Sequence, residues 1–341
     1  MTDFKITFTP RVFHFKQPAG TSRGVYQTRK SWLVYVQAEG RLGRGECAPL
    51  PDLSCDAIDG YEDYLAGMCR DVERLGHIDY DRYADYPSML FGLETALLSW
   101  RRGSDILFDT PFGRGEEGIA INGLVWMGTY EEMCSRIEEK IAAGFKCVKL
   151  KIGAIDFEKE LDMIRSIRSR FTARQIELRV DANGGFGTDD ALDKLNLLAS
   201  FGLHSIEQPI RQGQWKVMAE LCRKSPLPIA LDEELIGVNR REEKMRLLDT
   251  VRPSYIVLKP SLHGGMRGVE EWVSLARERG IGSWITSALE SNIGLNAVAH
   301  LDAHIYGPDI RMPQGLGTGL LFTDNIEMPV RIIGNKIYYR R

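Results

Sequence analysis

The sequence lacks an excess of charge of either sign. Its 341 residues include 44 Lys and Arg against 47 Asp and Glu, which gives a formal net charge of −3. Non-specific nucleic-acid binding needs a basic face, so we expect no nucleic-acid partner. A hydrophobic fraction of 43% with 27% charged residues is typical of a globular protein that buries its own core.

Long apolar runs are also missing. No stretch of about 18 consecutive apolar residues occurs, so the sequence predicts no transmembrane helix and no membrane partner. The N-terminal segment MTDFKITFTPRVFHF alternates apolar and polar residues and carries charge. It does not have the basic, apolar and small-residue blocks of a signal peptide, so we expect a cytoplasmic protein. The sequence leaves open whether the protein forms an oligomer.

Closely spaced metal-binding or disulfide-forming pairs are absent. The six cysteines are scattered and form no CxxC motif, which is typical of free thiols in a cytosolic protein. His300 and His304 are one helical turn apart but belong to an apolar pattern without HExxH, so we expect them to be structural rather than zinc ligands. The cysteines are Cys47, Cys55, Cys69, Cys134, Cys147 and Cys222.

The first part of the chain has the pattern of an α+β unit. Lys5–Lys16 and Ser31–Ala38 alternate apolar and polar residues and predict strands of an antiparallel meander. Ala57–Leu75 and Ser88–Arg102 have apolar residues at helical spacing. The segment Asp109–Gly118 is rich in glycine, proline and charge and predicts a linker.

From about residue 119 short apolar strands alternate with amphipathic helices. This alternation predicts an α/β fold with a parallel sheet, and the regular spacing favours a closed barrel over an open sheet. Helical patterns include Phe157–Arg170, Asp189–Ser200 and Gly268–Arg279. A further alternating stretch, Val330–Tyr339, ends the chain. The predicted strands are Ile119–Gly123, Cys147–Ile152, Ile176–Asp181, Ser205–Gln208, Ile229–Asp232, Tyr255–Lys259 and Gly282–Ser287.

Several predicted strands end in a charged or polar residue. The intervals between successive ones are 30, 26, 25, 27 and 28 residues, which is one strand and one helix each. In a parallel barrel all these positions reach the C-terminal rim, where active sites are built. A charge directly after an apolar run must point into the barrel mouth or find a partner. The residues are Lys151, Asp181, Glu207, Asp232, Lys259 and Ser287.

Three of these residues are acids on consecutive strands. Without a cation, Asp181, Glu207 and Asp232 would repel one another. Their oxygen ligands suit Mg²⁺, whereas zinc prefers nitrogen or sulfur. Because strand residues alternate, Glu234 is expected to share a face with Asp232 and Glu233 to point away. We therefore assign Asp232 as the third ligand and keep Glu234 as the alternative.

Lysines flank the acids on the neighbouring strands. Lys149 and Lys151 are two residues apart, so both are expected to face inward, with Lys259 opposite. Crowded ammonium groups and a divalent cation lower the pKa of a lysine, which allows it to act as a base. A metal ion with a lysine base is an arrangement that stabilises an enediolate after proton abstraction next to a carboxylate.

Other features carry a weaker signal. Residues 315–319 read GLGTG, which predicts a tight loop at the barrel rim rather than a P-loop, because no lysine follows. His263 lies in a glycine-flanked loop after Lys259 and could reach a substrate. Arg23 and Arg44 could contact a carboxylate, although surface charge is the simpler interpretation.

Taken together, the motifs resemble the enolase superfamily in its muconate lactonizing subgroup. That subgroup has a KxK motif on the second barrel strand, metal-binding acids on strands three to five and a lysine on strand six. The resemblance covers nearly the whole chain. The matching residues are Lys149-Leu150-Lys151, Asp181, Glu207, Asp232 and Lys259.

The resemblance implies a modified (β/α)7β TIM-like barrel over residues 116–319. It also implies an N-terminal α+β capping domain over residues 1–115, completed by about residues 320–341. Loops of this capping domain, near Gln17–Arg23 and Ala48–Cys55, are expected to close over the barrel and exclude water.

A closer resemblance is to the o-succinylbenzoate synthase branch of the subgroup. It rests on the segments IVLKPSLHGG (256–265), ITSALESNIGLNAVAHL (285–301) and GLGTGLLFTDN (315–325). It implies a Mg²⁺-dependent lyase, with Mn²⁺ as a possible substitute, that acts in menaquinone biosynthesis. The implied reaction dehydrates 2-succinyl-6-hydroxy-2,4-cyclohexadiene-1-carboxylate to 2-succinylbenzoate through a metal-stabilised enediolate.

The resemblance also implies a role for each residue of the set. Lys151 would remove the proton next to the carboxylate, and Lys259 would stabilise the enediolate from the other face. The metal would be held by Asp181, Glu207 and Asp232. The small carboxylate substrate would be bound by Lys149, Asn183 and Ser287.

The same machinery supports other reactions of the subgroup. Dipeptide epimerases and N-acylamino acid racemases also move a proton between two opposed lysines. Epimerases typically carry a DxD motif at the eighth strand, whereas residues 315–319 contain no acid here. Muconate cycloisomerisation is a weaker alternative. Mandelate racemase-like chemistry needs a histidine after strand seven, where Ser287 stands. A metal-binding scaffold would tolerate loss of the lysines, yet both Lys151 and Lys259 are present.

Overall fold

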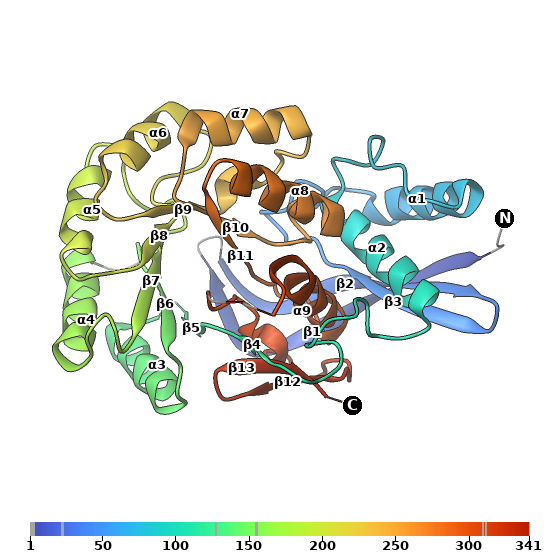
Figure 1. Ribbon diagram of the computed structural model, residues 1–341, viewed down its shortest axis with the longest axis horizontal. Coiled ribbons are helices and arrows are strands. Elements are labelled where there is room, and N and C mark those ends of the chain that lie inside the picture. Colours follow the sequence, from blue (N-terminus) through green and yellow to red (C-terminus); the bar gives the residue numbers. More distant parts are fainter. Residues whose placement is uncertain are drawn as a thin grey trace.

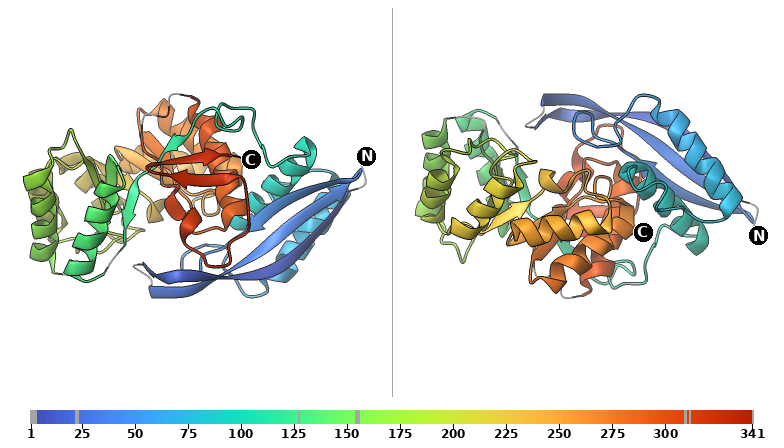
Figure 2. Two further views of the ribbon diagram at one scale, coloured as in Figure 1. Left: turned by 90° about the horizontal axis from the view of Figure 1, so that it is seen from below. Right: turned by 90° about the horizontal axis from the view of Figure 1, so that it is seen from above.

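A three-stranded antiparallel sheet forms the N-terminal part of the protein. The computed structural model describes residues 4–21, 24–126, 128–153, 156–308, 310 and 312–340. Strands β1 (Lys5–Thr21), β2 (Gly24–Ala38) and β3 (Arg41–Cys47) pair in the order β1-β2-β3. The predicted meander is confirmed, and its first two strands are longer than predicted. Figure 2 shows the β1–β2 hairpin (blue) passing alongside the C-terminal part of the chain (red).

Two helices, α1 (Tyr61–Leu75) and α2 (Pro87–Arg102), complete this part. Helix α2 lies directly on β3, because Gly45 faces Gly92 without a side chain between them. A Cβ atom added at Gly45 would lie 1.9 Å from the carbonyl oxygen of Gly92. Helix α2 ends where Gly103 adopts a left-handed conformation with φ of 61°. A separate hydrophobic cluster fills the space between the helices and the sheet.

A curled parallel sheet forms the second part, and helices cover its outside (Figure 1). Over the described residues it has seven strands in sequence order, so the predicted α/β barrel class is confirmed. The strands are β5 (Gly123–Val125), β6 (Cys147–Lys151), β7 (Glu177–Asp181), β8 (Ser205–Glu207), β9 (Ile229–Leu231), β10 (Tyr255–Leu258) and β11 (Gly282–Ile285). The helices are α3 (Tyr130–Ala142), α4 (Phe157–Arg170), α5 (Ala191–Ala199), α6 (Trp215–Lys224), α7 (Arg241–Val251), α8 (Gly265–Glu278) and α9 (Asn292–Tyr306).

Local capping explains why some helix predictions match the structure. The predicted helix Phe157–Arg170 has the same bounds as α4. Its N-cap, Asp156, accepts hydrogen bonds from the backbone N–H groups of Glu158 and Lys159. An Asp, Ser or Thr at this position satisfies N–H groups that have no partner within the helix. Ser291 caps α9 in the same way by accepting from the N–H of Ile293 at 3.2 Å.

The first predicted barrel strand, Ile119–Gly123, is wrong in its assignment. The structure divides this apolar run between two sheets. Strand β4 (Ile119–Ala120) pairs with a C-terminal strand, and the barrel strand β5 begins only at Gly123. Between them the N–H of Asn122 donates to the carbonyl oxygen of Gln314 at 3.0 Å. This hydrogen bond joins the start of the first barrel strand to the segment that follows α9. Periodicity cannot reveal such a change of sheet within one run.

The predicted C-terminal stretch is a hairpin rather than one strand. Strands β12 (Val330–Ile333) and β13 (Lys336–Tyr339) pair with each other, and β13 also pairs with β4. Just before the hairpin the chain contacts β1, where the N–H of Lys16 donates to the carbonyl oxygen of Leu321 at 2.8 Å. The division into a capping domain (1–115 with about 320–341) and a barrel (116–319) stays a prediction.

None of the helices in the described ranges is long and apolar enough to cross a membrane. The largest hydrophobic cluster lies between the barrel strands and their helices and continues into the N-terminal part through Phe13, Leu33 and Phe91. The carboxyl ends of the barrel strands are where polar side chains gather, and these form the candidate site.

Candidate active site

The sheet register places the predicted site residues side by side. Strand β6 pairs with β7 so that Lys151 stands opposite Asp181, and β7 pairs with β8 so that Asp181 stands opposite Glu207. All three lie at the last residue of their strands. The polar residues predicted at consecutive strand ends therefore meet at one rim of the barrel.

Lys149 and Lys151 bind the acids from the β6 side. The ammonium of Lys149 donates to both carboxylate oxygens of Glu207, at 2.7 and 2.6 Å, and lies 2.9 Å from Asp181. The ammonium of Lys151 donates to Asp181 at 2.6 Å and to the side-chain oxygen of Asn183 at 2.7 Å. Both lysines face inward, as expected from their spacing.

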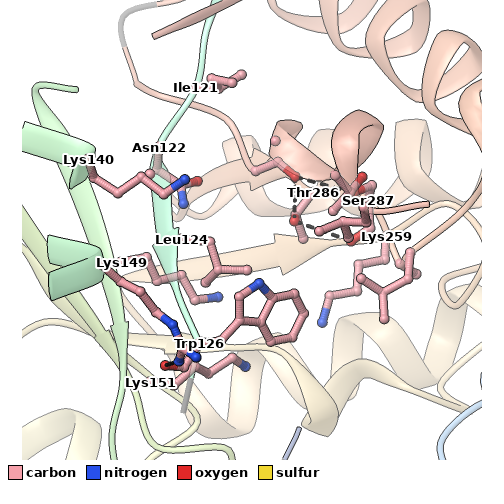
Figure 3. Close-up of a pocket in the computed structure, with 18 of the residues that line it drawn as sticks. Ile121, Asn122, Leu124, Trp126, Lys140, Lys149, Lys151, Lys259, Thr286 and Ser287 are labelled. Carbon is pink, nitrogen blue, oxygen red and sulfur yellow. Dashed lines mark hydrogen bonds between the residues drawn. The ribbon is translucent and has the colours of Figure 1, made fainter. Parts of the chain in front are cut away.

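Lys259 enters from the other side of the barrel. It follows β10, and its ammonium donates to Oδ2 of Asp232. Figure 3 shows Lys149 and Lys151 reaching into the cavity from one wall and Lys259 from the opposite wall. The structure therefore places Lys149 and Lys151 on one side of the cavity and Lys259 on the opposite side.

The charges in the site shift the pKa values of its members. Burial favours neutral amines, but the carboxylates of Asp181 and Glu207 outweigh it and raise the pKa of Lys149. Burial also acts to lower the pKa of Lys259, but the negative charge of Asp232 outweighs burial and raises that pKa. The expected lowering of lysine pKa values is therefore not found for these two, because carboxylates are their nearest charged neighbours.

The acids respond to the same contacts. Burial acts to raise the pKa of Asp181, but the ammonium groups of Lys149 and Lys151 lower it. For Glu207, burial and the charge of Asp181 dominate, and its pKa is raised. A nearby cation that contacts the oxygens of a buried acid stabilises its ionised form.

The three predicted metal ligands form a donor set of hard oxygens. Asp181 and Asp232 are close enough to Glu207 for their charges to act on its carboxyl group. Among the described side chains, however, no group of three His, Cys, Asp or Glu residues stands in a ready arrangement for a metal, because ammonium groups lie between the acids. Oδ1 of Asp232 is buried with no hydrogen-bond partner in the described part of the chain. The donor chemistry and this unpaired oxygen fit a hard divalent cation.

The predicted orientations of Glu233 and Glu234 are wrong. Glu233 lines the cavity and accepts a hydrogen bond from Nδ2 of Asn183 at 2.9 Å. Glu234 points away and accepts from Gln208 at 3.1 Å and from the N–H of Gly213 at 2.7 Å. The strand alternation ends at Asp232 because a 3-10 turn, η1 (Glu233–Leu235), follows it. Glu234 is therefore engaged outside the site.

The cavity above these residues has a volume of about 570 Å³. Its wall is largely apolar and comes from distant parts of the chain. Leu50 and Leu53 belong to the loop after β3, and Trp126 follows β5. Such a combination of charged floor and apolar wall fits a carboxylate attached to a hydrophobic body. The remaining large apolar lining residues are Ile121, Leu124, Phe145, Trp284, Leu289, Leu321 and Ile332.

Asn183 and Ser287, the other predicted substrate contacts, both line the cavity. The hydroxyl groups of Ser287 and Thr318 are 2.6 Å apart and hydrogen-bonded. Gly315, Gly317 and Thr318 of the GLGTG segment line the same wall, in agreement with a rim loop. The side chains of Thr286 and Ser287 are seen at this wall in Figure 3.

Other candidate residues do not reach the cavity. His263 is fully buried, and its Nδ1 accepts from the backbone N–H of Lys259 at 2.8 Å, so it supports the Lys259 loop from behind. Burial lowers the pKa of His263 to about 3. Arg44 pairs with Asp105 at 2.7 Å. Arg23 lies outside the described residues. His300 packs against aromatic rings of Phe112 and Tyr339.

Trp126 and Lys140 are among the lining residues that the sequence analysis did not identify. Trp126 directly follows β5, so correct placement of that strand would have shown it at the rim. Lys140 on α3 also lines the cavity, and Figure 3 shows its ammonium at the cavity edge. Lys140 has no carboxylate partner among the described residues. No sequence signal distinguishes it from the other lysines of an amphipathic helix.

Comparison with protein families identifies both parts of the chain. Residues 132–328 match the family described as enolase C-terminal domain-like, and residues 21–100 match the family described as MenC, N-terminal domain. The o-succinylbenzoate synthase of Desulfotalea psychrophila is 45% identical, over 98% of each chain. The L-Ala-D/L-Glu epimerase of Bacillus subtilis is 23% identical, over 84% of this chain and 81% of the epimerase.

Solved structures show the same fold. MenC from Desulfotalea psychrophila superposes with a TM-score of 0.84 at 41% identity, covering 99% of this chain and 100% of that one. A dipeptide epimerase from Enterococcus faecalis, complexed with Mg and the dipeptide L-Leu-L-Tyr, has the same TM-score of 0.84 at 17% identity. It covers 100% of this chain and 98% of its own, and at this identity it demonstrates a shared fold.

Proposed function

The chain belongs to the o-succinylbenzoate synthase family of lyases in the enolase superfamily, and we propose that it dehydrates 2-succinyl-6-hydroxy-2,4-cyclohexadiene-1-carboxylate to 2-succinylbenzoate in menaquinone biosynthesis. The observation that carries the proposal is the pair of opposed lysines, Lys151 and Lys259, in a cavity whose wall is apolar. The identity of 45% with a synthase over 98% of both chains supports the same reaction.

In this proposal Lys151 removes the proton from the carbon next to the substrate carboxylate. The same ammonium then gives this proton to the departing hydroxyl group, which leaves as water while the ring becomes aromatic. One C–H and one C–O bond break, and the proton ends on the leaving oxygen. Lys151 must be the neutral amine when it takes the proton, and general-base groups of this kind contribute about 10²–10⁴-fold in rate.

Lys259 stands on the opposite side of the cavity and remains an ammonium in this scheme. Its positive charge stabilises the negative charge that develops on the substrate carboxylate when the proton leaves. The position of Lys259 supports this role, because its ammonium faces the cavity opposite Lys151. The two lysines thus have different tasks, a base on β6 and a fixed charge after β10.

Asp181, Glu207 and Asp232 are the residues that would hold Mg²⁺, with Mn²⁺ as a substitute. When bound, the divalent cation supplies a positive charge next to the substrate carboxylate and so favours proton removal. The ammonium groups of Lys149 and Lys151 now occupy oxygens of these acids, so both must withdraw from them in the loaded enzyme. That withdrawal would free Lys151 to reach the substrate.

The remainder of the substrate has an apolar ring and a chain that ends in a second carboxylate. The apolar wall with Leu50, Trp126 and Leu289 suits the ring. Ser287 is a candidate for the chain, since it offers a hydroxyl group just after β11 and lines the cavity. Gln17 of β1 and Leu50 and Leu53 of the loop after β3 belong to the wall and would exclude water. The expected loop near Gln17–Arg23 is strand β1 as far as Thr21.

Dipeptide epimerisation and N-acylamino acid racemisation remain the alternatives, because opposed lysines also suit them. The epimerase relative is only 23% identical, against 45% for the synthase. The rim segment 315–319, where epimerases typically carry two acids for the substrate ammonium, has none here.

The purified protein with Mg²⁺ should consume the cyclohexadiene substrate, followed by its ultraviolet absorbance, and form 2-succinylbenzoate, identified by mass spectrometry. A parallel reaction with L-Ala-L-Glu in deuterated water measures exchange of the α-proton. Rapid deuterium incorporation without any dehydration would overturn the synthase proposal and favour the epimerase. A protein inactivated by replacement of Lys151 is the matched blank for both reactions.

A further inference from the structure

Arg29 connects two loops that lie on opposite sides of the interface between the N-terminal part and the barrel. It belongs to β2, and its side chain is only 2% exposed. Its guanidinium donates to the carbonyl oxygens of Ala48 and Pro49 in the loop after β3. It also donates to the carbonyl oxygens of Leu289 at 3.3 Å and Ala288 at 3.5 Å, in the loop after β11.

Both loops form the wall of the candidate active site. Leu50 and Pro51 follow directly after the first pair of carbonyls, and Ala288 and Leu289 carry the second pair. All four of these residues line the cavity, whereas Arg29 itself is not among the lining residues. Arg29 therefore contacts the wall from behind and can influence a substrate only through the two loops.

The geometry requires an arginine. A guanidinium presents five N–H groups in a rigid planar fork, so it can serve several carbonyls that point in different directions. A lysine ammonium offers its donors at a single point and would leave some of these buried carbonyls without a hydrogen-bond partner. A neutral side chain would in addition leave Glu46 and Glu290, whose charges act on Arg29, without this cation.

The loop after β11 is held in an unusual conformation at the same place. Leu289 has a φ of 63°, a left-handed conformation that is unfavourable for a residue with a side chain. Its neighbours are fixed by hydrogen bonds, since the N–H of Ala288 donates to Glu290 at 2.6 Å. Backbone strain of this kind persists only where surrounding contacts impose it, and it concentrates at functional sites.

We propose that Arg29 is a positioning residue that locks the loop 48–51 onto the loop 287–289 and thereby sets the shape of the substrate-binding wall, a role that rests on the proposed synthase function. Arg29 takes no part in proton transfer. Its loss loosens the wall and weakens substrate binding, while the lysines and the acids keep their contacts.

The test compares Arg29→Gln and Arg29→Lys with a matched control, Arg168→Gln. Arg168 also donates to backbone carbonyls, those of Phe201 at 2.7 Å, Ile176 at 2.9 Å and Gly202 at 3.1 Å, but it is not among the cavity-lining residues. Both replacements remove a carbonyl-binding arginine and lower thermal stability. Only the Arg29 variants are expected to raise KM, by about tenfold for Gln and less for Lys, with a smaller change in kcat.

Each outcome decides the proposal. A folded Arg29→Gln protein with KM within about twofold of the wild type, or an Arg168→Gln protein with an equal rise in KM, overturns it. If Arg29→Gln does not fold, the KM of Arg29→Lys is compared with those of the wild type and Arg168→Gln instead. Lysine keeps the positive charge but lacks the planar guanidinium. A wild-type protein that does not dehydrate the cyclohexadiene substrate contradicts the proposed function instead. In that case the Kd for 2-succinylbenzoate, measured by calorimetry, replaces KM in the comparison of the Arg29 variants with Arg168→Gln and the wild type.

Discussion

The carboxylate of Glu46 caps a helix of the barrel by accepting hydrogen bonds from Ser291. Its oxygens accept from the backbone N–H of Ser291 at 3.0 Å and from the Ser291 hydroxyl at 2.5 Å, and a third bond comes from the N–H of Gly294 at 3.0 Å. Glu46 belongs to β3, so the N-terminal part of the chain satisfies the N-terminus of α9. A negative charge at this position is favoured by the helix dipole.

Glu94 of α2 makes the same contact with α8. It accepts from the N–H groups of Met266 at 2.5 Å and Arg267 at 3.2 Å. Helices α8 and α9 follow β10 and β11, the strands that lead into Lys259 and Ser287. The N-terminal part therefore contacts the half of the barrel that carries Lys259 and Ser287. This half is also the one nearest to it in Figure 1.

Replacing Glu46 by Gln should destabilise the protein by about 1–3 kcal/mol. The amide has one acceptor oxygen where the carboxylate has two, and it lacks the charge that the helix N-terminus favours. The free energy of unfolding in urea measures the effect. Glu242→Gln, an exposed change in the first turn of α7, is the control and should stay within about 0.5 kcal/mol of the wild type. Equal losses in both variants would contradict the capping role.

Glu94 should make stability fall as the pH rises towards neutrality. Burial raises its pKa from 4.5 to about 7, even though its hydrogen bonds to Met266 and Arg267 act in the opposite direction. The folded protein therefore holds this proton more tightly than the unfolded chain. The resulting stabilisation is complete below about pH 4.5 and is lost as the pH rises through about 7.

Urea unfolding of the wild type and of Glu94→Gln at several pH values measures this effect. The difference between the two proteins should change by on the order of 2–3 kcal/mol between pH 4.5 and 7.5, with the wild type losing stability relative to the variant. Parallel curves over this range would show that Glu94 does not titrate as the buried environment indicates.

Replacing Lys151 by Ala should abolish dehydration while the fold is kept. Removal of a general base costs about 10²–10⁴-fold in kcat, and removal of the fixed charge of Lys259 should cost a comparable factor. Lys146→Ala is the matched control, since Lys146 is an exposed residue just before the same strand. Initial rates and circular dichroism are measured together. Retained activity in Lys151→Ala would remove it from the proposed mechanism.

Chelation of divalent cations should remove activity, and Mg²⁺ or Mn²⁺ should restore it. Asp232→Asn should weaken Mg²⁺ binding by at least about tenfold, because an amide oxygen is a poorer ligand than a carboxylate. Isothermal titration calorimetry reports binding independently of turnover. Asp249→Asn, on the outer helix α7, is the control and should bind Mg²⁺ like the wild type. Full activity in the presence of excess chelator would contradict the assignment of these acids.

Much of the fold could be predicted because its signals are local. Apolar runs such as Tyr255–Lys259 and caps such as Asp156 act over a few residues, and they give the strand and helix order of the barrel. One failure comes from a long-range strand pairing and the other from a local turn. The run Ile119–Gly123 splits between two sheets, and Glu233 turns inward because a 3-10 turn replaces the alternation.

The sequence by itself determined the barrel and the order of its strand-end residues. One strand and one helix between successive positions bring Lys151, Asp181 and Glu207 to the same rim, since parallel strands share a direction. The tertiary structure alone decided what surrounds them. Arg29 meets Leu289 across 260 residues, and Glu46 meets Ser291 across 245. Such contacts depend on how distant segments of the chain pack together, and neither spacing nor periodicity encodes that arrangement.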